Sequence, residues 1–362
     1  MNYGARLKRL VQAAAKEEIG ALLVTHPANV RYLCGFTGSA GALVITEHEN
    51  VLITDGRYKT QARNEVRGAQ VVTAKKGFPA AIAELLGTKS GRKRRCLLGI
   101  APEHTSVAER DRLEASLPTC WKLRSAPSLV ERLRMIKDAS ELELIRKAVL
   151  LAARLFDDCL KSIRAGVTER DIAAELEYAA GRHGAEGMAF ETIIASGERS
   201  ALPHGRASSA TVPASGFVVC DLGVILAGYC SDMTRSIYVG RAARDAGRFY
   251  GAVLEAQLAG VDAVRPGVTV NHVDAAARKV LRRAGLARYF THSTGHGVGL
   301  EIHEAPRIAA GQADVLQPGM VITIEPGAYV PGKWGVRIED MVVVTETGCE
   351  VLTPTTKQLL TV

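Results

Sequence analysis

The first third of the chain alternates short apolar runs with amphipathic segments. Apolar residues recur at helical spacing within residues 1–20, and β-rich runs separated by turn residues follow. Strands interleaved with helices indicate a small α/β domain of about 125 residues. We expect strands at 41–46, 50–56, 69–74, 95–101 and the start of 21–33, and helices at 59–66 and 78–87.

Longer helical patterns begin near residue 130. Residues 125–163 carry a helical pattern, within which Asp138 followed by Glu141 is typical of a capping box. Thr168 is expected to begin a further helix. The predicted domain boundary is the Ser- and Pro-containing connector at the start of this stretch. It divides the chain into domains of 1–130 and 131–362.

Strands and glycine-rich loops dominate the chain after residue 190, apart from a helical stretch at 243–285. The second domain is therefore predicted to be α+β. The expected fold class is an α/β domain followed by a larger α+β domain, and every candidate for chemistry lies in the second.

The composition of the chain is that of a globular protein. The chain has 362 residues, of which 47% are hydrophobic and 23% charged, which excludes a disordered or low-complexity chain. No apolar run approaches the ~20 residues that span a bilayer, and the N-terminal segment lacks the apolar stretch of a signal peptide. The seven cysteines are scattered, and their odd number favours reduced thiols and a cytoplasmic protein.

A net charge of +8 permits contact with nucleic acid but does not require it. The densest basic run, at 91–95, is short and contains no aromatic residue. We interpret it as a solvated loop and expect no nucleic-acid or membrane partner.

Two aspartates interrupt a pair of apolar runs that are predicted to form a hairpin. A turn centred on Leu226 and Ala227 would place Asp221 and Asp232 directly opposite one another. A turn at Ala227 and Gly228 would make them diagonal neighbours, and in both cases their Cβ atoms are about 5–8 Å apart on one face. Ordinary aspartates at a turn or strand edge are the alternative. Two buried carboxylates that face one another repel, by contrast, so they must pair with a positively charged side chain, take up a proton or bind a metal ion.

Three more residues join the two aspartates as candidates for the site. One is a histidine that lies between two glycines, and the other two are glutamates. His296 is flanked by two glycines, which indicates a close approach of the backbone to a neighbouring group. Glu325 ends one apolar strand, and Glu339 lies within another. Arg337 shares a face with Glu339 and could neutralise it alone, so a structural salt bridge is the alternative there.

Together these residues indicate a metal centre. The four carboxylates carry four negative charges when ionised, which two divalent cations would balance. Carboxylates with a single histidine and no cysteine suit Mn²⁺ best, with Co²⁺, Fe²⁺ and Zn²⁺ as alternatives. Two such ions about 3.5–4 Å apart would share a hydroxide whose lowered pKa makes it nucleophilic at neutral pH.

The five candidate ligands lie in the contexts CDLG, SDMTR, GHGVGLEIHE, IEPG and RIEDM. These contexts closely resemble those of the dinuclear metallopeptidases of the pita-bread fold, a family that includes methionine aminopeptidase, aminopeptidase P and prolidase. The runs VTHPANVRYLCGFTGSAGALVIT and VLITDGRYKTQA resemble the creatinase-type N-terminal domain of the proline-specific branch. The resemblance covers essentially the whole chain and implies a creatinase-like N-terminal domain followed by a pita-bread catalytic domain.

The resemblance implies a role for each candidate residue. Glu325 would handle the proton of the bridging water in addition to binding metal. His204 and His303 would contact the substrate near the scissile bond, and Arg337 would support the metal carboxylates. Further substrate contacts would come from His292, Arg307 and Tyr329. The implied metal ligands are Asp221, Asp232, His296, Glu325 and Glu339.

The implied reaction is hydrolysis of the Xaa-Pro bond in proline-containing peptides. We expect aminopeptidase P activity, with prolidase activity on Xaa-Pro dipeptides as the alternative. A prolidase needs a cation for the free proline carboxylate, and Arg307 resembles the arginine that supplies it, with an ordinary surface-loop arginine as the alternative. Creatinase and a non-catalytic binding protein are more remote, because all five ligand residues are present. Members of this branch commonly form homodimers, so a homodimer is also implied.

Overall fold

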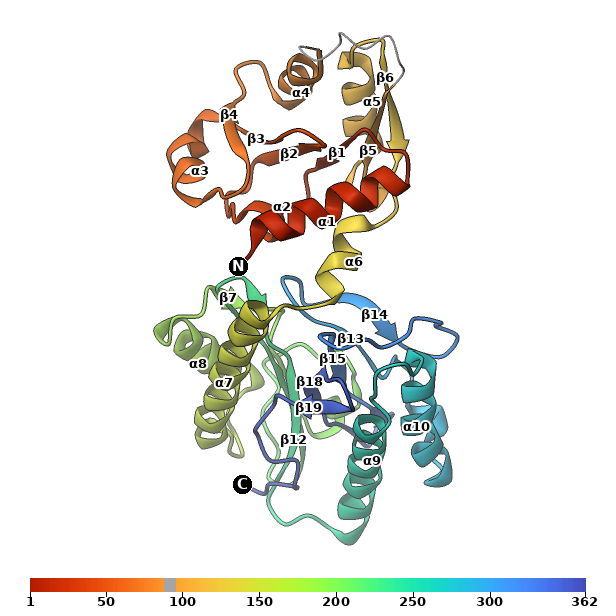
Figure 1. The fold of residues 1–362 in the computed structure, drawn as a ribbon. Helices are drawn as coiled ribbons and strands as arrows, with labels where there is room; N and C mark the ends of the chain where they lie inside the picture. Colours follow the sequence, from red (N-terminus) through yellow and green to blue (C-terminus); the bar gives the residue numbers. More distant parts are fainter. Residues whose placement is uncertain (88–95) are drawn as a thin grey trace. The chain divides into compact units, whose positions relative to one another are not determined.

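The computed structural model describes residues 1–87 and 96–362, and these form two units, Met1–Arg134 and Met135–Val362 (Figure 1). The boundary predicted after residue 130 lies four residues before this division. The basic run at 91–95, interpreted above as a solvated loop, lies outside the described residues.

The strands of the N-terminal unit form one mixed sheet and are β1 (Ala21–Val24), β2 (Gly41–Thr46), β3 (Asn50–Thr54), β4 (Gln70–Thr73), β5 (Cys96–Ile100) and β6 (Trp121–Ser125). The helices are α1 (Tyr3–Lys16), α2 (Pro27–Cys34), α3 (Lys59–Glu65), α4 (Phe78–Gly87), α5 (Val107–Ser116) and α6 (Leu129–Met135). The strand order is β4-β3-β2-β1-β5-β6. Helices α4 and α5 cover one face, and α1 and α2 cover the other (Figure 1), so the central strands are buried on both faces.

The α/β character predicted for this unit is confirmed. The predicted strands and helices are all present, and β2 has the predicted bounds. The sequence did not predict α2, α5 or β6. Helix α2 follows directly on β1 with Pro27 in its first turn, so a single run of mostly apolar residues contains both a strand and a helix.

The strands of the second unit are β7 (Gly187–Met188), β8 (Ile193–Ser196), β9 (Gly216–Leu222), β10 (Val224–Leu226), β11 (Tyr229–Cys230), β12 (Met233–Val239), β13 (Gly295–Gly297), β14 (Glu304–Ile308), β15 (Val321–Ile324), β16 (Gly327–Val330), β17 (Trp334–Arg337), β18 (Asp340–Val344) and β19 (Cys349–Val351). The helices are α7 (Ala139–Ser162), α8 (Glu169–Arg182), α9 (Arg244–Asp262) and α10 (Val270–Arg283). Helices α7 and α8 pack on β9 and β12, and the pair α9 and α10 packs on the other side of the strands (Figure 1). The strands that hold the candidate ligands therefore lie between two helix pairs.

The helical pattern over 125–163 corresponds to two helices, α6 and α7. Asp138 begins α7 with the predicted capping box, in which its side chain accepts from the backbone N–H of Glu141 and the Glu141 side chain accepts from the backbone N–H of Asp138. The residues between the helices are not helical, because the Lys137 N–H donates to the Gly319 carbonyl oxygen (2.9 Å) instead of to its own helix.

Thr168 begins α8 as predicted, since its hydroxyl accepts from the Asp171 N–H. The helical stretch at 243–285 consists of two helices, α9 and α10. None of the helices in residues 1–87 and 96–362 combines the length and apolar character that crossing a bilayer requires.

Candidate metal centre

Strands β9 and β12 bring the two predicted aspartates together. Asp221 lies opposite Thr234 in their antiparallel register, so Asp232, two residues earlier, is its diagonal neighbour. The turn is at Ala227 and Gly228, whose φ angles of 49° and 84° are those of a two-residue type I′ hairpin. Both aspartates are buried. Of the two hairpins that the sequence allows, the structure has the diagonal one.

The glycines beside His296 are required by the packing of β13. A Cβ atom at Gly295 would lie 1.9 Å from the carbonyl oxygen of Thr323, and one at Gly297 would lie 2.2 Å from that of Ala305. The close backbone approach predicted here is confirmed, and the neighbouring groups are strand backbones.

His296 presents a lone pair to the site. Its Nδ1–H donates to the Gly297 carbonyl oxygen (3.0 Å), which fixes the orientation of the ring. Burial lowers the pKa of His296 to about 4, so the ring is neutral near pH 7 and Nε2 carries no proton. Nε2 lies 3.5 Å from Oδ2 of Asp232 and 3.4 Å from Oε1 of Glu325. A cation between the three groups would satisfy this lone pair and both carboxylates.

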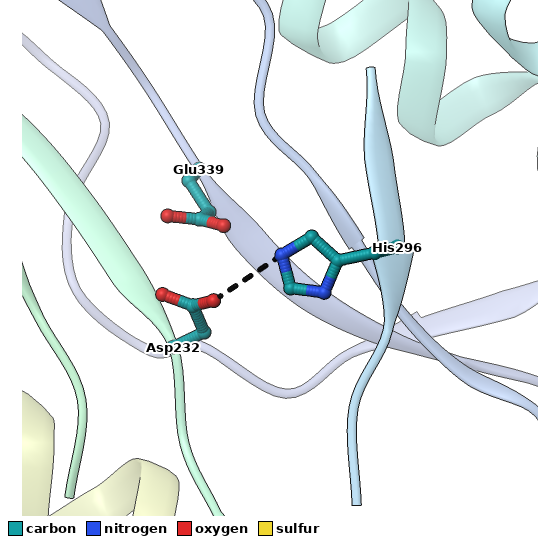
Figure 2. A group of neighbouring side chains, drawn as sticks. All are labelled: Asp232, His296 and Glu339. Carbon is teal, nitrogen blue, oxygen red and sulfur yellow. Dashed lines mark ion pairs between the residues drawn. The ribbon is translucent and has the colours of Figure 1, made fainter. Parts of the chain in front are cut away.

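The two glutamates emerge at the same end of neighbouring strands in a five-stranded sheet of order β14-β13-β15-β18-β19. Glu325 follows β15 and Glu339 precedes β18, and these strands pair antiparallel through Ile324 and Asp340. Figure 2 shows Asp232 and Glu339 directed toward the His296 imidazole from separate segments, and their ligand atoms lie within 4.8 Å of one another.

Burial and mutual repulsion perturb these carboxyl groups. Burial, followed by the negative charges of neighbouring carboxylates, raises the pKa of Asp232 and Glu339 well above the usual range. Burial also raises the pKa of Glu325 to about 7. The folded protein therefore resists complete ionisation of the cluster unless positive charge is added.

Arg337 joins the cluster through Asp221 rather than Glu339. Its Nη2 donates to Oδ2 of Asp221 (2.6 Å), and its Nε donates to the hydroxyl oxygen of Thr234 (3.0 Å). The Thr234 hydroxyl in turn donates to Oε2 of Glu339 (2.7 Å). The direct salt bridge considered for Arg337 and Glu339 is replaced by this chain, because the strand register places Thr234 between them. Thr234 is not among the predicted site residues, although it lies in the SDMTR motif.

The cluster lacks partners for its charges. Four ionised carboxylates and one guanidinium leave a net charge of −3. Oδ1 of Asp221 and Oε1 of Glu339 are buried and have no hydrogen-bond partner in the described part of the chain. Burying such an oxygen without a partner is costly. An oxygen-rich donor set with one imidazole fits divalent ions such as Mn²⁺, so the residues present suit a metal site.

The cluster lines a pocket of about 740 Å³. His303 stands beside the candidate ligands, with its ring edge-on to that of His296 at a centroid distance of 4.4 Å. Burial lowers the pKa of His303. His204 and Arg307 are exposed on the same pocket. The structure thus gathers all the predicted site residues except Tyr329 around one cavity, namely His204, Asp221, Asp232, His292, His296, His303, Arg307, Glu325, Arg337 and Glu339.

Tyr329 lies behind the pocket rather than along it. Its hydroxyl accepts from Nη1 of Arg337 (2.7 Å) and contacts Nε2 of His292 (3.0 Å). Burial lowers the pKa of His292 to about 3, and its Nδ1–H donates to the Ser293 carbonyl oxygen (2.8 Å), so Nε2 accepts from Tyr329. Burial raises the pKa of Tyr329 to about 12, which keeps this hydroxyl protonated. Both residues therefore support Arg337, and the nitrogens of His292 are already engaged.

Glu304 forms a further part of the wall that sequence reasoning missed, and Lys137, which does not line the pocket, pairs with it. Nζ of Lys137 lies 3.2 Å from Oε2 of Glu304, and both side chains are buried. A Cβ atom at Gly299 would lie 2.6 Å from this carboxylate, so the glycine admits it. The only signal in the sequence is that Glu304 directly follows His303.

Comparisons with known proteins match both units. The family model described as metallopeptidase family M24 matches residues 143–346, and the one described as creatinase/prolidase N-terminal domain matches residues 6–136. The Xaa-Pro dipeptidase of Pyrococcus furiosus is 38% identical over 356 residues, which covers 98% of this chain and 99% of the relative.

Two solved structures are similar over nearly the full length. The Xaa-Pro dipeptidase from Bacillus anthracis has a TM-score of 0.95 and 38% identity, and the match covers 100% of both chains. The X-Pro aminopeptidase from Thermotoga maritima MSB8 has a TM-score of 0.90 and 36% identity, with 99% of this chain and 100% of that chain covered.

Proposed function

The chain belongs to metallopeptidase family M24, and we propose that it hydrolyses the Xaa-Pro bond of dipeptides. The predicted family, creatinase-type domain and pita-bread fold are confirmed by the matches to both units. The sequence led us to expect aminopeptidase P activity first, but the comparisons favour the dipeptidase alternative, because the Pyrococcus furiosus and Bacillus anthracis relatives both carry that name. Aminopeptidase P activity is the second candidate, because the similar structure from Thermotoga maritima is that of an X-Pro aminopeptidase.

The dipeptidase proposal rests on the positive charge of Arg307 at the pocket, which is unpaired in the described part of the chain. Three arginines line the pocket, and two of them are already paired, Arg206 with Glu191 (2.8 Å) and Arg337 with Asp221 (2.6 Å). Within residues 1–87 and 96–362, Arg307 has no ion-pair partner, and it is exposed. The free carboxylate of a dipeptide's proline needs such a cation, whereas a longer peptide has an amide at that position.

The chain's own residues can perform the remaining steps. Bound divalent ions supply Lewis acidity and a water of lowered pKa. The Glu325 carboxylate holds a proton of the attacking water and passes it to the proline nitrogen, which is part of a tertiary amide and must be protonated to leave. His204 and His303 donate hydrogen bonds to the oxygen of the scissile carbonyl as negative charge develops there. The ions would be held by Asp221, Asp232, His296, Glu325 and Glu339.

Product analysis on two peptides tests the proposal. The protein is stripped with a chelator, reloaded with Mn²⁺ and given Leu-Pro and Leu-Pro-Ala side by side. We expect free proline from the dipeptide and an intact tripeptide. Release of leucine from the tripeptide would instead assign aminopeptidase P activity. Hydrolysis of neither peptide by metal-loaded protein would contradict proline specificity altogether.

The variant Arg307→Gln tests the carboxylate contact. Loss of a hydrogen bond between charged groups should raise KM for Leu-Pro by about 10- to 100-fold, with kcat nearly unchanged. Arg206→Gln is the matched control, because Arg206 lines the same pocket but is paired with Glu191. An equal rise of KM in the two variants would contradict a specific role for Arg307.

Three finer assignments complete the proposal. We propose Mn²⁺ as the ion because the donor set is rich in carboxylates. A cytoplasmic location rests on the scattered, odd set of cysteines. A homodimer rests on the family resemblance. Metal analysis of protein purified without chelator and light scattering on a sizing column test the first and the last.

A further inference from the structure

We propose that Glu169 positions His204 in the pocket by anchoring both ends of the loop that carries it. This loop comprises residues 196–208 and is termed the His204 loop below. The inference rests on the proposed function for its catalytic consequence, and part of its test is independent of that function.

Glu169 accepts hydrogen bonds from opposite ends of the His204 loop. It is the first residue of α8, and its side chain is fully buried. Oε1 accepts from the backbone N–H (2.8 Å) and hydroxyl (3.0 Å) of Ser196. Oε2 accepts from the backbone N–H (3.1 Å) and hydroxyl (2.7 Å) of Ser208. One carboxylate thus joins residues that are twelve positions apart in the chain.

Arg199 provides the counter-charge from within the loop. Its Nε lies 3.2 Å and 3.0 Å from the two oxygens of Glu169. Its Nη2 donates to the Arg206 carbonyl oxygen (2.8 Å), so the same side chain also spans the loop. The helix N-terminus at Glu169 adds a further favourable field for its negative charge.

The centre of the loop depends on these anchors. Pro203 accepts from Nη1 of Arg337 through its carbonyl oxygen (2.9 Å), and the Ser200 hydroxyl oxygen accepts from the Gly335 N–H (2.9 Å). No side chain in the described residues hydrogen bonds to the His204 ring, which is exposed on the pocket. The loop backbone alone therefore sets where the imidazole points.

The donors around Glu169 require a carboxylate rather than an amide. Both oxygens face N–H and O–H donors from Ser196, Arg199 and Ser208. A glutamine would replace one acceptor oxygen by an NH₂ group, which only donates. One end of the loop would then lose its anchor and leave buried donors without an acceptor.

Hydrogen exchange of the full-length, metal-loaded protein provides the first readout. In Glu169→Gln we expect faster amide exchange across 196–208, measured by mass spectrometry. Glu175→Gln is the matched control, since Glu175 lies on the same helix and accepts from Ser162, outside the loop. Its exchange across 196–208 should equal that of the wild type. Unchanged exchange in Glu169→Gln would overturn the proposal.

A double-mutant cycle with His204→Ala provides the second readout. Misplacing one catalytic contact should make Glu169→Gln lower kcat for the hydrolysed peptide by about 10- to 100-fold. The same change should cost less than about threefold when residue 204 is already alanine, because the two residues act through one contact. Equal reductions in the two backgrounds would mean that Glu169 only stabilises the fold, which would overturn its positioning role.

Ser208→Ala keeps the test decisive if Glu169→Gln does not fold. This milder variant removes one donor to the carboxylate and should shift loop exchange and kcat in the same directions, whereas wild-type values for both would count against the anchor. The exchange readout uses no substrate. If wild-type enzyme cleaves neither peptide, the proposed function fails while loop exchange still decides whether Glu169 is the anchor.

Discussion

Glu339 and Asp340 are neighbours in the chain, yet they belong to buried charge clusters of two different kinds. Glu339 lies among three other carboxylates, and its Oε1 has no partner in the described residues. Asp340 is completely buried as well, but it accepts from Arg235 (2.7 Å), Lys357 (2.7 Å) and Gln257 (2.9 Å).

Arg235 shows how complete the second cluster is. It is buried, and besides Asp340 it donates to four backbone carbonyl oxygens, those of Thr234, Glu339, Thr355 and Thr356. All five N–H groups of the guanidinium are therefore used. Burial and charge are common to the two clusters, so the missing partners are what mark the Glu339 side as a cation site.

The largest loss of stability should come from disrupting the cluster of Asp340 and Arg235, in which every charged group has a partner. Arg235→Met leaves the buried Asp340 carboxylate short of its principal partner, which should lower the free energy of unfolding by about 3–5 kcal/mol. Urea unfolding of the metal-free protein measures this. A loss below about 1 kcal/mol would mean that Lys357 and Gln257 suffice, and the clusters would differ less than their geometry indicates.

A substitution in the carboxylate cluster around Glu339 should lower activity without lowering stability. Glu339→Gln removes a proposed metal ligand, so activity should fall at least ~100-fold, because even residues behind the ligands cost 10- to 100-fold. The free energy of unfolding of the metal-free protein should stay equal or rise, since a buried glutamine, unlike Glu339, requires neither an unpaired charge nor the uptake of a proton on folding. A loss of stability comparable to that of Arg235→Met would contradict the distinction between the clusters.

The metal-free protein should also lose stability between pH 6.5 and 8. The raised pKa values of Asp232, Glu325 and Glu339 mean that the folded state retains protons that the unfolded state has released. Stability therefore falls as the pH rises, until each group ionises in the folded state as well, which for Glu325 occurs at about pH 7. The slope is about 1.4 kcal/mol per pH unit for each such proton. The lowered pKa values of His292 and His296, about 3 and about 4, make stability rise with pH, but only up to the unfolded value near 6.5.

Bound metal should abolish this loss, because divalent ions favour the ionised carboxylates. The measurement compares urea midpoints of chelated and Mn²⁺-loaded protein at pH 6.5 and pH 8. Equal changes in the two forms would contradict a cation site at this cluster.

The smallest effect should come from an ion pair that is short but exposed. Arg146 and Glu350 approach to 2.5 Å and are 40% and 49% exposed. Glu350→Gln should change the free energy of unfolding by less than about 0.5 kcal/mol, because solvent screens such pairs. A loss close to that of Arg235→Met would show that distance, rather than burial, determines the stabilisation.

Signals confined to a few neighbouring residues made much of this fold predictable. Asp138 and Glu141 indicate the start of α7, and the glycines beside His296 indicate close backbone packing. Asp221 and Asp232 stand out because they interrupt apolar strands, where a charged group needs a reason to be buried. Apolar periodicity similarly gave the alternation of strands and helices in the N-terminal unit.

The choice of partners could not be predicted, because it depends on how separate sheets pack. Arg337 pairs with Asp221 at a sequence separation of 116, and nothing near either residue favours this over Glu339. Glu169 bonds to residues 27 and 39 positions away, so the sequence shows it only as an acidic residue in a first helical turn. Arg235 likewise looks like one more polar residue of the SDMTR motif.

Counting bound ions tests the central claim most directly. Chelator-stripped protein is titrated with Mn²⁺ in a calorimeter, and Glu339→Gln is titrated in parallel. We expect two ions per chain in the wild type and fewer in Glu339→Gln. No binding by the wild type, or the same number of ions in both proteins, would contradict a metal centre built on the unpartnered carboxylates.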